Sequence, residues 1–348
     1  MHCVGGYIPS YQALMTGYGG TILYDVGDPL HPHAVCKISN TRAHIVTGTA
    51  FEYLVPRPDG TTDVVLHALG SNNESVAATF KADIYHGVGG WYNPIAWGPS
   101  LSAMAYLADG GTDAQGFGVT DVWLATTTGR FKIYSYSVPG RDAFGRPGFA
   151  PVTLGFSPDG DYLAAGWTVA TSPVRVFRLS DRANVTPAWP ADFRFAFWGK
   201  KDDTLFIVGL QSVASWKPGG VVATVPSTPA WVLDPNLSPD GTQVAFTALT
   251  STRDVRPYVY GLNARTSRLL VNQSRSSTAF VRSGWVWYAE EKPCGQPTPE
   301  NPCFDPTQPD GKFLAFELVT GRESLVTFAA GEGPSNFGAT PVDLWPSP

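Results

Sequence analysis

The sequence predicts an all-β fold built from one repeated unit of short strands. Two segments, LGFSPDGDYLAAGW at 154–167 and PNLSPDGTQVAFTA at 235–248, are copies of one pattern. Between them lies a degenerate third copy, FAFWGKKDDTLFIVG at 195–209. The spacing between neighbouring copies is therefore about 40 residues, which is the period of a four-stranded blade in a β-propeller.

The composition also favours many short strands packed into a large core. Hydrophobic residues make up 43% of the chain and charged residues only 15%, so there is ample apolar surface to bury. The 37 Gly and 30 Pro are spread along the chain in the way that tight turns between short strands require. Closed all-β architectures often exceed about 250 residues as one unit, so we expect a single domain over 1–348.

The shared letters SPDG explain why a hairpin forms at the same point of each repeat. Proline presets the φ angle that the second turn position needs, aspartate caps the turn, and glycine supplies the positive φ from which the next strand begins. The strands on both sides are rich in aromatic and β-branched residues. This pattern is typical of blades that stack face to face and bury both surfaces.

The same period extended in both directions predicts the number of blades. Six blades begin near Arg42, Trp91, Pro151, Phe193, Trp231 and Thr278. The segment 1–40 holds three more strands, and PVDLW at 341–345 is strand-like without a blade of its own. Building one blade from both chain ends would remove an open sheet edge. We therefore expect seven blades rather than six, with the ring closed by the N- and C-terminal strands.

The phrases FSPDG and LSPDG, each followed by an apolar strand, resemble the WD40-like PD40 repeats of TolB-like bacterial propellers and of prolyl oligopeptidase propeller domains. The resemblance covers two blades well and a third weakly. It implies a propeller that binds partners or acts as a gating scaffold. The peptidases carry a separate α/β-hydrolase domain, for which this chain has no room, and the G-x-S-x-G elbow is missing.

The four cysteines predict the compartment of the protein. Cys294 and Cys303 bracket GQPTPENP, a segment that a local disulfide would order, which leaves Cys3 to pair with Cys36. The alternative is two buried free thiols. A zinc site is disfavoured because neither pair has the C-x₂₋₄-C spacing. Disulfides indicate a secreted, periplasmic or cell-envelope protein, although MHCVGGYIPSYQ does not have the pattern of a signal peptide.

Charge and hydropathy limit the partners. The net charge is −5 and the 24 Lys and Arg are scattered, so we expect no nucleic-acid partner. We also expect no membrane span, because the chain lacks the run of roughly 18 apolar residues that a spanning helix needs. The expected protein is a monomer that binds a small-molecule or protein ligand at one mouth of the central channel.

Four residues are predicted to bind that ligand. His86, Trp91 and Asn93 share the loop KADIYHGVGGWYNP, which enters the third blade and has glycines that let a ligand approach the backbone. Glu290 ends a strand just before the Cys-bracketed insertion at 292–311, a loop long enough to suggest a function. The alternatives are an ordinary inter-blade loop and a solvated rim.

A second set of residues suggests a metal site. His44 begins an inner strand and His86 precedes one, and Asp192 and Asp234 occupy comparable positions in later blades. Such side chains could hold Ca²⁺ or Zn²⁺ and activate a water, which would make the protein a metal-dependent hydrolase of esters, lactones or phosphate esters. Histidines satisfied by backbone are the plainer interpretation, and a glycan-binding lectin is a third possibility. The leading hypothesis remains binding without chemistry.

Overall fold

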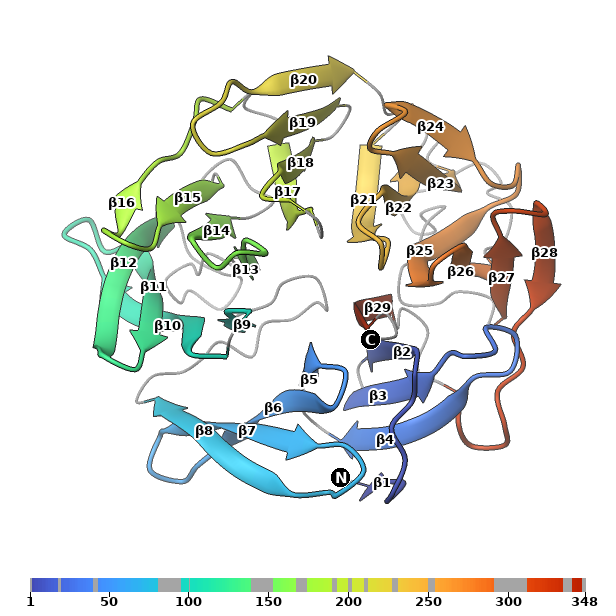
Figure 1. Cartoon of the computed structure of the whole chain (residues 1–348), viewed down its shortest axis with the longest axis horizontal. Helices are drawn as coiled ribbons and strands as arrows, with labels where there is room; N and C mark the ends of the chain where they lie inside the picture. The colour runs from blue at the N-terminus through green and yellow to red at the C-terminus, as the bar shows by residue number, and fades with distance from the viewer. Residues whose placement is uncertain are drawn as a thin grey trace. The chain divides into compact units, whose positions relative to one another are not determined.

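The computed structural model describes the chain except for residues 1, 18–19, 40–42, 81–94, 100, 139–152, 167–173, 190–192, 200–201, 210–211, 227–230, 250–253, 291–311, 334–339 and 346–348. The described residues form 29 strands in seven antiparallel sheets and contain no helix (Figure 1). The chain is thus an all-β propeller of seven blades, as the repeat period predicted. Among the described residues, no helix is long and apolar enough to cross a membrane.

The described residues group into two compact units, which we treat separately. Unit 1 comprises Met1–Val55, Asp63–Thr79 and Ser227–Pro348, and unit 2 comprises Pro56–Thr62 and Phe80–Pro226. The single domain expected over 1–348 stays a prediction.

Unit 1 holds blades 1, 2, 6 and 7. Blade 1 contains β1 (His2–Cys3), β2 (Gln12–Gly17), β3 (Gly20–Asp25), β4 (His33–Ser39) and β29 (Thr340–Trp345). Blade 2 contains β5 (Ala43–Thr47), β6 (Ala50–Pro56), β7 (Thr62–Ala68) and β8 (Glu74–Phe80). Blade 6 contains β21 (Trp231–Leu237), β22 (Gln243–Leu249), β23 (Val255–Gly261) and β24 (Thr266–Leu269). Blade 7 contains β25 (Arg275–Arg282), β26 (Trp285–Glu290), β27 (Phe313–Glu317) and β28 (Arg322–Leu325).

Unit 2 holds blades 3, 4 and 5. Blade 3 contains β9 (Ile95–Trp97), β10 (Ala103–Thr112), β11 (Gly118–Thr126) and β12 (Gly129–Val138). Blade 4 contains β13 (Thr153–Phe156), β14 (Tyr162–Gly166), β15 (Arg175–Arg178) and β16 (Ala183–Asn184). Blade 5 contains β17 (Phe193–Trp198), β18 (Leu205–Gly209), β19 (Ser212–Trp216) and β20 (Ala223–Pro226).

Blade 1 is built from both ends of the chain, as predicted. The C-terminal strand β29 pairs antiparallel with β2, with Leu14 opposite Asp343, and both ends of the chain reach this sheet (Figure 1). The order of the sheet is β1-β4-β3-β2-β29, so β1 is a fifth strand at the other edge that the sequence did not predict. A disulfide between Cys3 and Cys36 joins β1 to β4. This bond confirms the predicted pair, and the alternative of two free thiols is wrong.

The repeated turns form as their residues require, with one contribution that the sequence did not reveal. Ser157 donates its hydroxyl to Asp159 at 2.5 Å, and Gly160 takes a φ of +81°. Ser238 and Asp240 repeat this bond at 2.6 Å in the second copy. The serine of SPDG therefore holds the aspartate that caps the turn.

Aromatic side chains fill the spaces between neighbouring blades of each unit. In unit 1, Trp287 of blade 7 is buried and donates its Nε1 proton to the Pro29 carbonyl of blade 1 at 3.0 Å. In unit 2, Trp198 of blade 5 donates to the Gly155 carbonyl of blade 4 at 2.9 Å. Both indole nitrogens find acceptors, as buried tryptophans normally do. Trp198 therefore packs between two neighbouring blades of unit 2.

Candidate functional site

Most of the predicted site residues lie outside the described part of the chain. They are His86, Trp91 and Asn93 of the loop before β9, and Asp192, which precedes β17. Asp234 belongs to β21, but its side chain is also outside the described part. The ligand-binding loop at 81–94 therefore stays a prediction.

His44 is the second residue of β5 and is half-buried, opposite Glu52 in the ladder with β6. Among the described residues, one group of three side chains could hold a metal ion, and it consists of Cys3, Cys36 and His67. His44 does not belong to that group. The metal site predicted from His44 and its three partners consequently stays a prediction.

Glu290 lies at the end of β26, at the point where the insertion leaves blade 7. Its backbone N–H donates to the Lys312 carbonyl at 2.9 Å, so the two ends of the insertion are held together. The Lys312 Nζ lies 3.9 Å from Glu290 Oε2, and the two side chains are 65% and 35% exposed. A loose, solvated pair of this kind contributes about 0–1 kcal/mol. The carboxylate of Glu290 is thus only weakly held by Lys312.

The neighbouring strand β25 places a buried arginine beside Glu290. Arg275 begins β25 directly opposite Glu290 and is only 7% exposed. Its Nε and Nη2 donate to the two carboxylate oxygens of Glu323 at 3.3 and 3.2 Å, which is a two-point pairing. The Tyr288 hydroxyl donates to the same carboxylate at 2.7 Å, and the guanidinium lies 5.8 Å from its ring centre.

Tyr288 remains a hydrogen-bond donor because its phenol is hard to ionise. Burial raises the pKa of Tyr288 well above its ordinary value, and the hydrogen bond to Glu323 raises it further. The carboxylate therefore receives both the phenol proton and the guanidinium fork. Because these bonds use both oxygens of Glu323, this carboxylate is held in one position.

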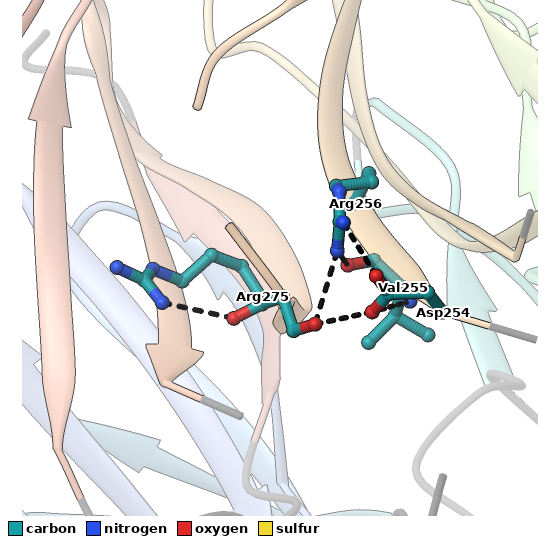
Figure 2. A network of polar contacts seen from close by, with 5 residues as sticks. Asp254, Val255, Arg256 and Arg275 are labelled. Atoms are coloured by element: carbon teal, nitrogen blue, oxygen red, sulfur yellow. Dashed lines mark hydrogen bonds and ion pairs between the residues drawn. The ribbon is translucent and has the colours of Figure 1, made fainter. Parts of the chain in front are cut away.

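A second set of contacts ties the segment before β23 to the segment before β25 (Figure 2). Ser274 donates its hydroxyl to Asp254 and accepts a hydrogen bond from Arg256 Nη1 at 3.0 Å. Arg256 also forms an ion pair with Asp254. Arg275 Nη1 donates to the Ser274 carbonyl at 2.9 Å, which joins this set to the contacts around Glu323.

The charged side chains around β25 are of two kinds, those held by several hydrogen bonds and those held by one weak ion pair. Arg256 and Arg275 are each paired with a carboxylate and hydrogen-bonded to further oxygens, as charges removed from water must be. The network therefore holds the loops in place. Lys312 lies beside it largely exposed, and Glu290 is half-buried. The arrangement is a fixed network with a loosely paired lysine and carboxylate next to it.

The sequence did not reveal the arginine network. It placed the start of the last blade near Thr278, whereas β25 begins at Arg275. The ladder is irregular between Ser276 and Ala279, and Ser277 has a φ of +52°, so the expected alternation is interrupted there. A signal was present in Arg275, the one charged residue in the polar run 274–278 that precedes the apolar part of the strand.

Comparison with known proteins identifies the fold. No family model matches the chain, and no curated protein matches it. Among solved structures it is similar to TolB from Acinetobacter baumannii, with 13% identity over 95% of this chain and 82% of that chain and a TM-score of 0.43. It is also similar to Sqt1 from Saccharomyces cerevisiae, with 10% identity over 94% of this chain and 90% of that chain and a TM-score of 0.51.

The shared feature is the propeller fold. At these identities the likeness says nothing about a ligand. The resemblance to WD40-like propellers that the SPDG repeats suggested is confirmed for the fold.

Proposed function

We propose that the chain is a propeller that binds a ligand or partner at one mouth of its channel and does no chemistry of its own. The observation that carries this proposal is the loose pair of Glu290 and Lys312 beside the fixed arginine network of blades 6 and 7. Rigid surfaces that present a few exposed charges favour recognition, because little order is lost when a ligand binds.

The charge of the insertion indicates the kind of ligand. Residues 290–312 contain five carboxylates, at Glu290, Glu291, Glu300, Asp305 and Asp310. They contain two cations, Lys292 and Lys312. A segment with this excess of negative charge attracts cationic partners and repels acidic ones. The proposed ligand is therefore a basic segment of a protein, with a lysine or arginine that replaces Lys312 beside Glu290.

The proposed place of action is the secreted space or the cell envelope. The disulfide between Cys3 and Cys36 supports this compartment, because such bonds persist where the surroundings are oxidising. The predicted bond between Cys294 and Cys303 lies outside the described residues. The hydrolase alternative stays a prediction for the same reason, since it depends on His86 and on Asp192.

The test compares lysine- and arginine-rich peptides with acidic peptides of equal length, by fluorescence anisotropy at two salt concentrations. We expect the basic peptides to bind more tightly, and Glu290→Gln to weaken them by about fivefold, the effect of one rim ion pair. The matched control is Glu317→Gln, at the far end of β27 from Lys312. Equal binding of acidic peptides, or an unchanged affinity in Glu290→Gln, would overturn the proposal.

A further inference from the structure

The Cys3–Cys36 disulfide has a histidine beside it that the sequence could not show. Cys3 and Cys36 are directly opposite residues of β1 and β4, with Cα atoms 4.1 Å apart. His67 comes from β7 of blade 2, and one of its ring nitrogens and the two sulfur atoms all lie within 4.8 Å of one another. The spacing of the two cysteines along the chain gives no sign of this neighbour. The fold supplies the missing ligand from a strand of the next blade.

His67 is oriented as a metal ligand would be. Its Nδ1 lies 3.2 Å from Glu74 Oε1, its side chain is 2% exposed, and Phe51 stacks on the ring with a centroid distance of 4.8 Å. The Tyr53 hydroxyl donates to the same carboxylate oxygen at 2.8 Å. A carboxylate that accepts the Nδ1 proton of a histidine fixes the tautomer in which the Nε2 lone pair is available.

In the oxidised protein the Nε2 lone pair of His67 accepts no hydrogen bond from the described residues, and the atom is buried. An acceptor removed from water without a partner is unfavourable and therefore rare in folded proteins, so this atom calls for an explanation. Two sulfur atoms and one imidazole nitrogen form a soft ligand set that suits Zn²⁺.

We propose that reduction of the Cys3–Cys36 disulfide creates a zinc site formed by Cys3, Cys36 and His67. A dithiol gives two electrons and two protons to the disulfide and becomes a disulfide itself, which leaves two cysteine thiols. Binding of Zn²⁺ then releases the two thiol protons, so the ion is held by two thiolates and a neutral imidazole. A solvent molecule completes the tetrahedron on the side of Cys3, which is only half-buried.

The geometry needs only a small movement. Tetrahedral zinc places its sulfur and nitrogen ligands roughly 3.3–3.8 Å apart, which lies within the present limit of 4.8 Å. The sulfur atoms must separate after reduction. Cys3 can provide this movement because β1 is very short and pairs only with β4. The metal would keep β1 attached to β4 in reducing surroundings, as the disulfide does in oxidising ones.

The experiment uses the whole chain with Cys294→Ser and Cys303→Ser, so that no other thiols bind metal. The protein is reduced with dithiothreitol, freed of it without oxygen, and titrated with Co²⁺ and then Zn²⁺. We expect one Co²⁺ per chain, with thiolate-to-cobalt charge transfer and tetrahedral ligand-field bands, and displacement by one Zn²⁺. The oxidised protein should give neither signal.

Two variants and a control separate the site from chance binding. His67→Gln should abolish the tetrahedral cobalt spectrum, and Glu74→Gln should weaken zinc about 10–100-fold, as loss of an outer carboxylate does. His33→Gln changes an exposed histidine of the same strand as Cys36 and should have no effect. If His67→Gln fails to fold in the oxidised state, Glu74→Gln decides. No cobalt spectrum in the reduced protein, or one that survives both variants, overturns the proposal.

Discussion

Arg275 is the residue on which the charged network of unit 1 depends. Replacing it with methionine removes both bonds to Glu323 and leaves that carboxylate beside Tyr288 without its cation. Breaking a buried pair costs about 3–5 kcal/mol, but Glu323 is partly exposed and can recover some water, so we expect Arg275→Met to lower the free energy of unfolding by about 2–3 kcal/mol. Denaturant unfolding measures this change.

The control for this substitution is an arginine with a similar pairing but a much more exposed side chain. Arg178 donates through Nε to Asp181 at 3.0 Å on the surface of blade 4, and both side chains are exposed. Arg178→Met should change the free energy of unfolding by less than about 1 kcal/mol. Equal losses in the two variants would show that burial of Arg275 does not matter.

Tyr53 makes the stability of the fold depend on pH in the alkaline range. Burial, followed by its hydrogen bond to Glu74, raises the pKa of Tyr53 to about 12. Tyrosine in the unfolded chain ionises near pH 10, so the folded protein holds this proton more tightly. The stabilisation from Tyr53 is therefore complete below about pH 10 and is lost as the pH rises to about 12.

The measurement for Tyr53 is chemical unfolding across this alkaline range, with Tyr53→Phe as the comparison. Other tyrosines also ionise there, so the difference between the two proteins isolates the contribution of residue 53. The wild type should lose more stability than Tyr53→Phe on the way to pH 12. Parallel curves would contradict the assigned hydrogen bond.

The last residue of β14, Gly166, has no room for a side chain. A Cβ atom on Gly166 would overlap the Val174 Cα, which is backbone and cannot move aside. We expect Gly166→Ala to reduce stability by about 1–3 kcal/mol, the usual effect of overpacking, as measured by thermal unfolding. Gly155→Ala in β13 is the control, because its Cβ would meet only Trp198 at 3.6 Å. A tolerated Gly166→Ala would contradict this close approach.

The strands show what local pattern can and cannot predict. Repeated SPDG turns and apolar strands depend on neighbours in the chain, so the sequence predicted the blades and the closing strand at 341–345. β1 was missed because so short a strand cannot show a period, and the start of β25 was hidden by the irregular ladder near Ser277. The network and the cysteine cluster join residues far apart in the chain, such as Arg275 and Glu323. Which loops meet is set by blade packing and not by any local signal.

The pairing of β29 with β2 joins the N-terminal and C-terminal segments of the chain in one sheet. Deletion of 340–348 would leave the N–H and C=O groups on one side of β2 without partners, and such edges pair with other chains. We expect this deletion to lower the unfolding temperature and to produce dimers or larger species in size-exclusion chromatography. Deletion of 346–348 keeps β29 and should leave a monomer. A monomeric, equally stable protein without β29 would contradict this account.

The same blade also fixes an order of events on the ribosome. The strands β1 to β4 are complete once Ser39 has emerged, and Cys3 and Cys36 can be oxidised as soon as both have left the exit tunnel. β29, the partner of β2, follows the strands of the other six blades in the chain. The edge of β2 that pairs with β29 therefore stays unpaired while the other six blades are synthesised. A nascent chain that has not yet reached residue 340 therefore carries an open edge on β2, and such edges pair with other chains unless they are covered.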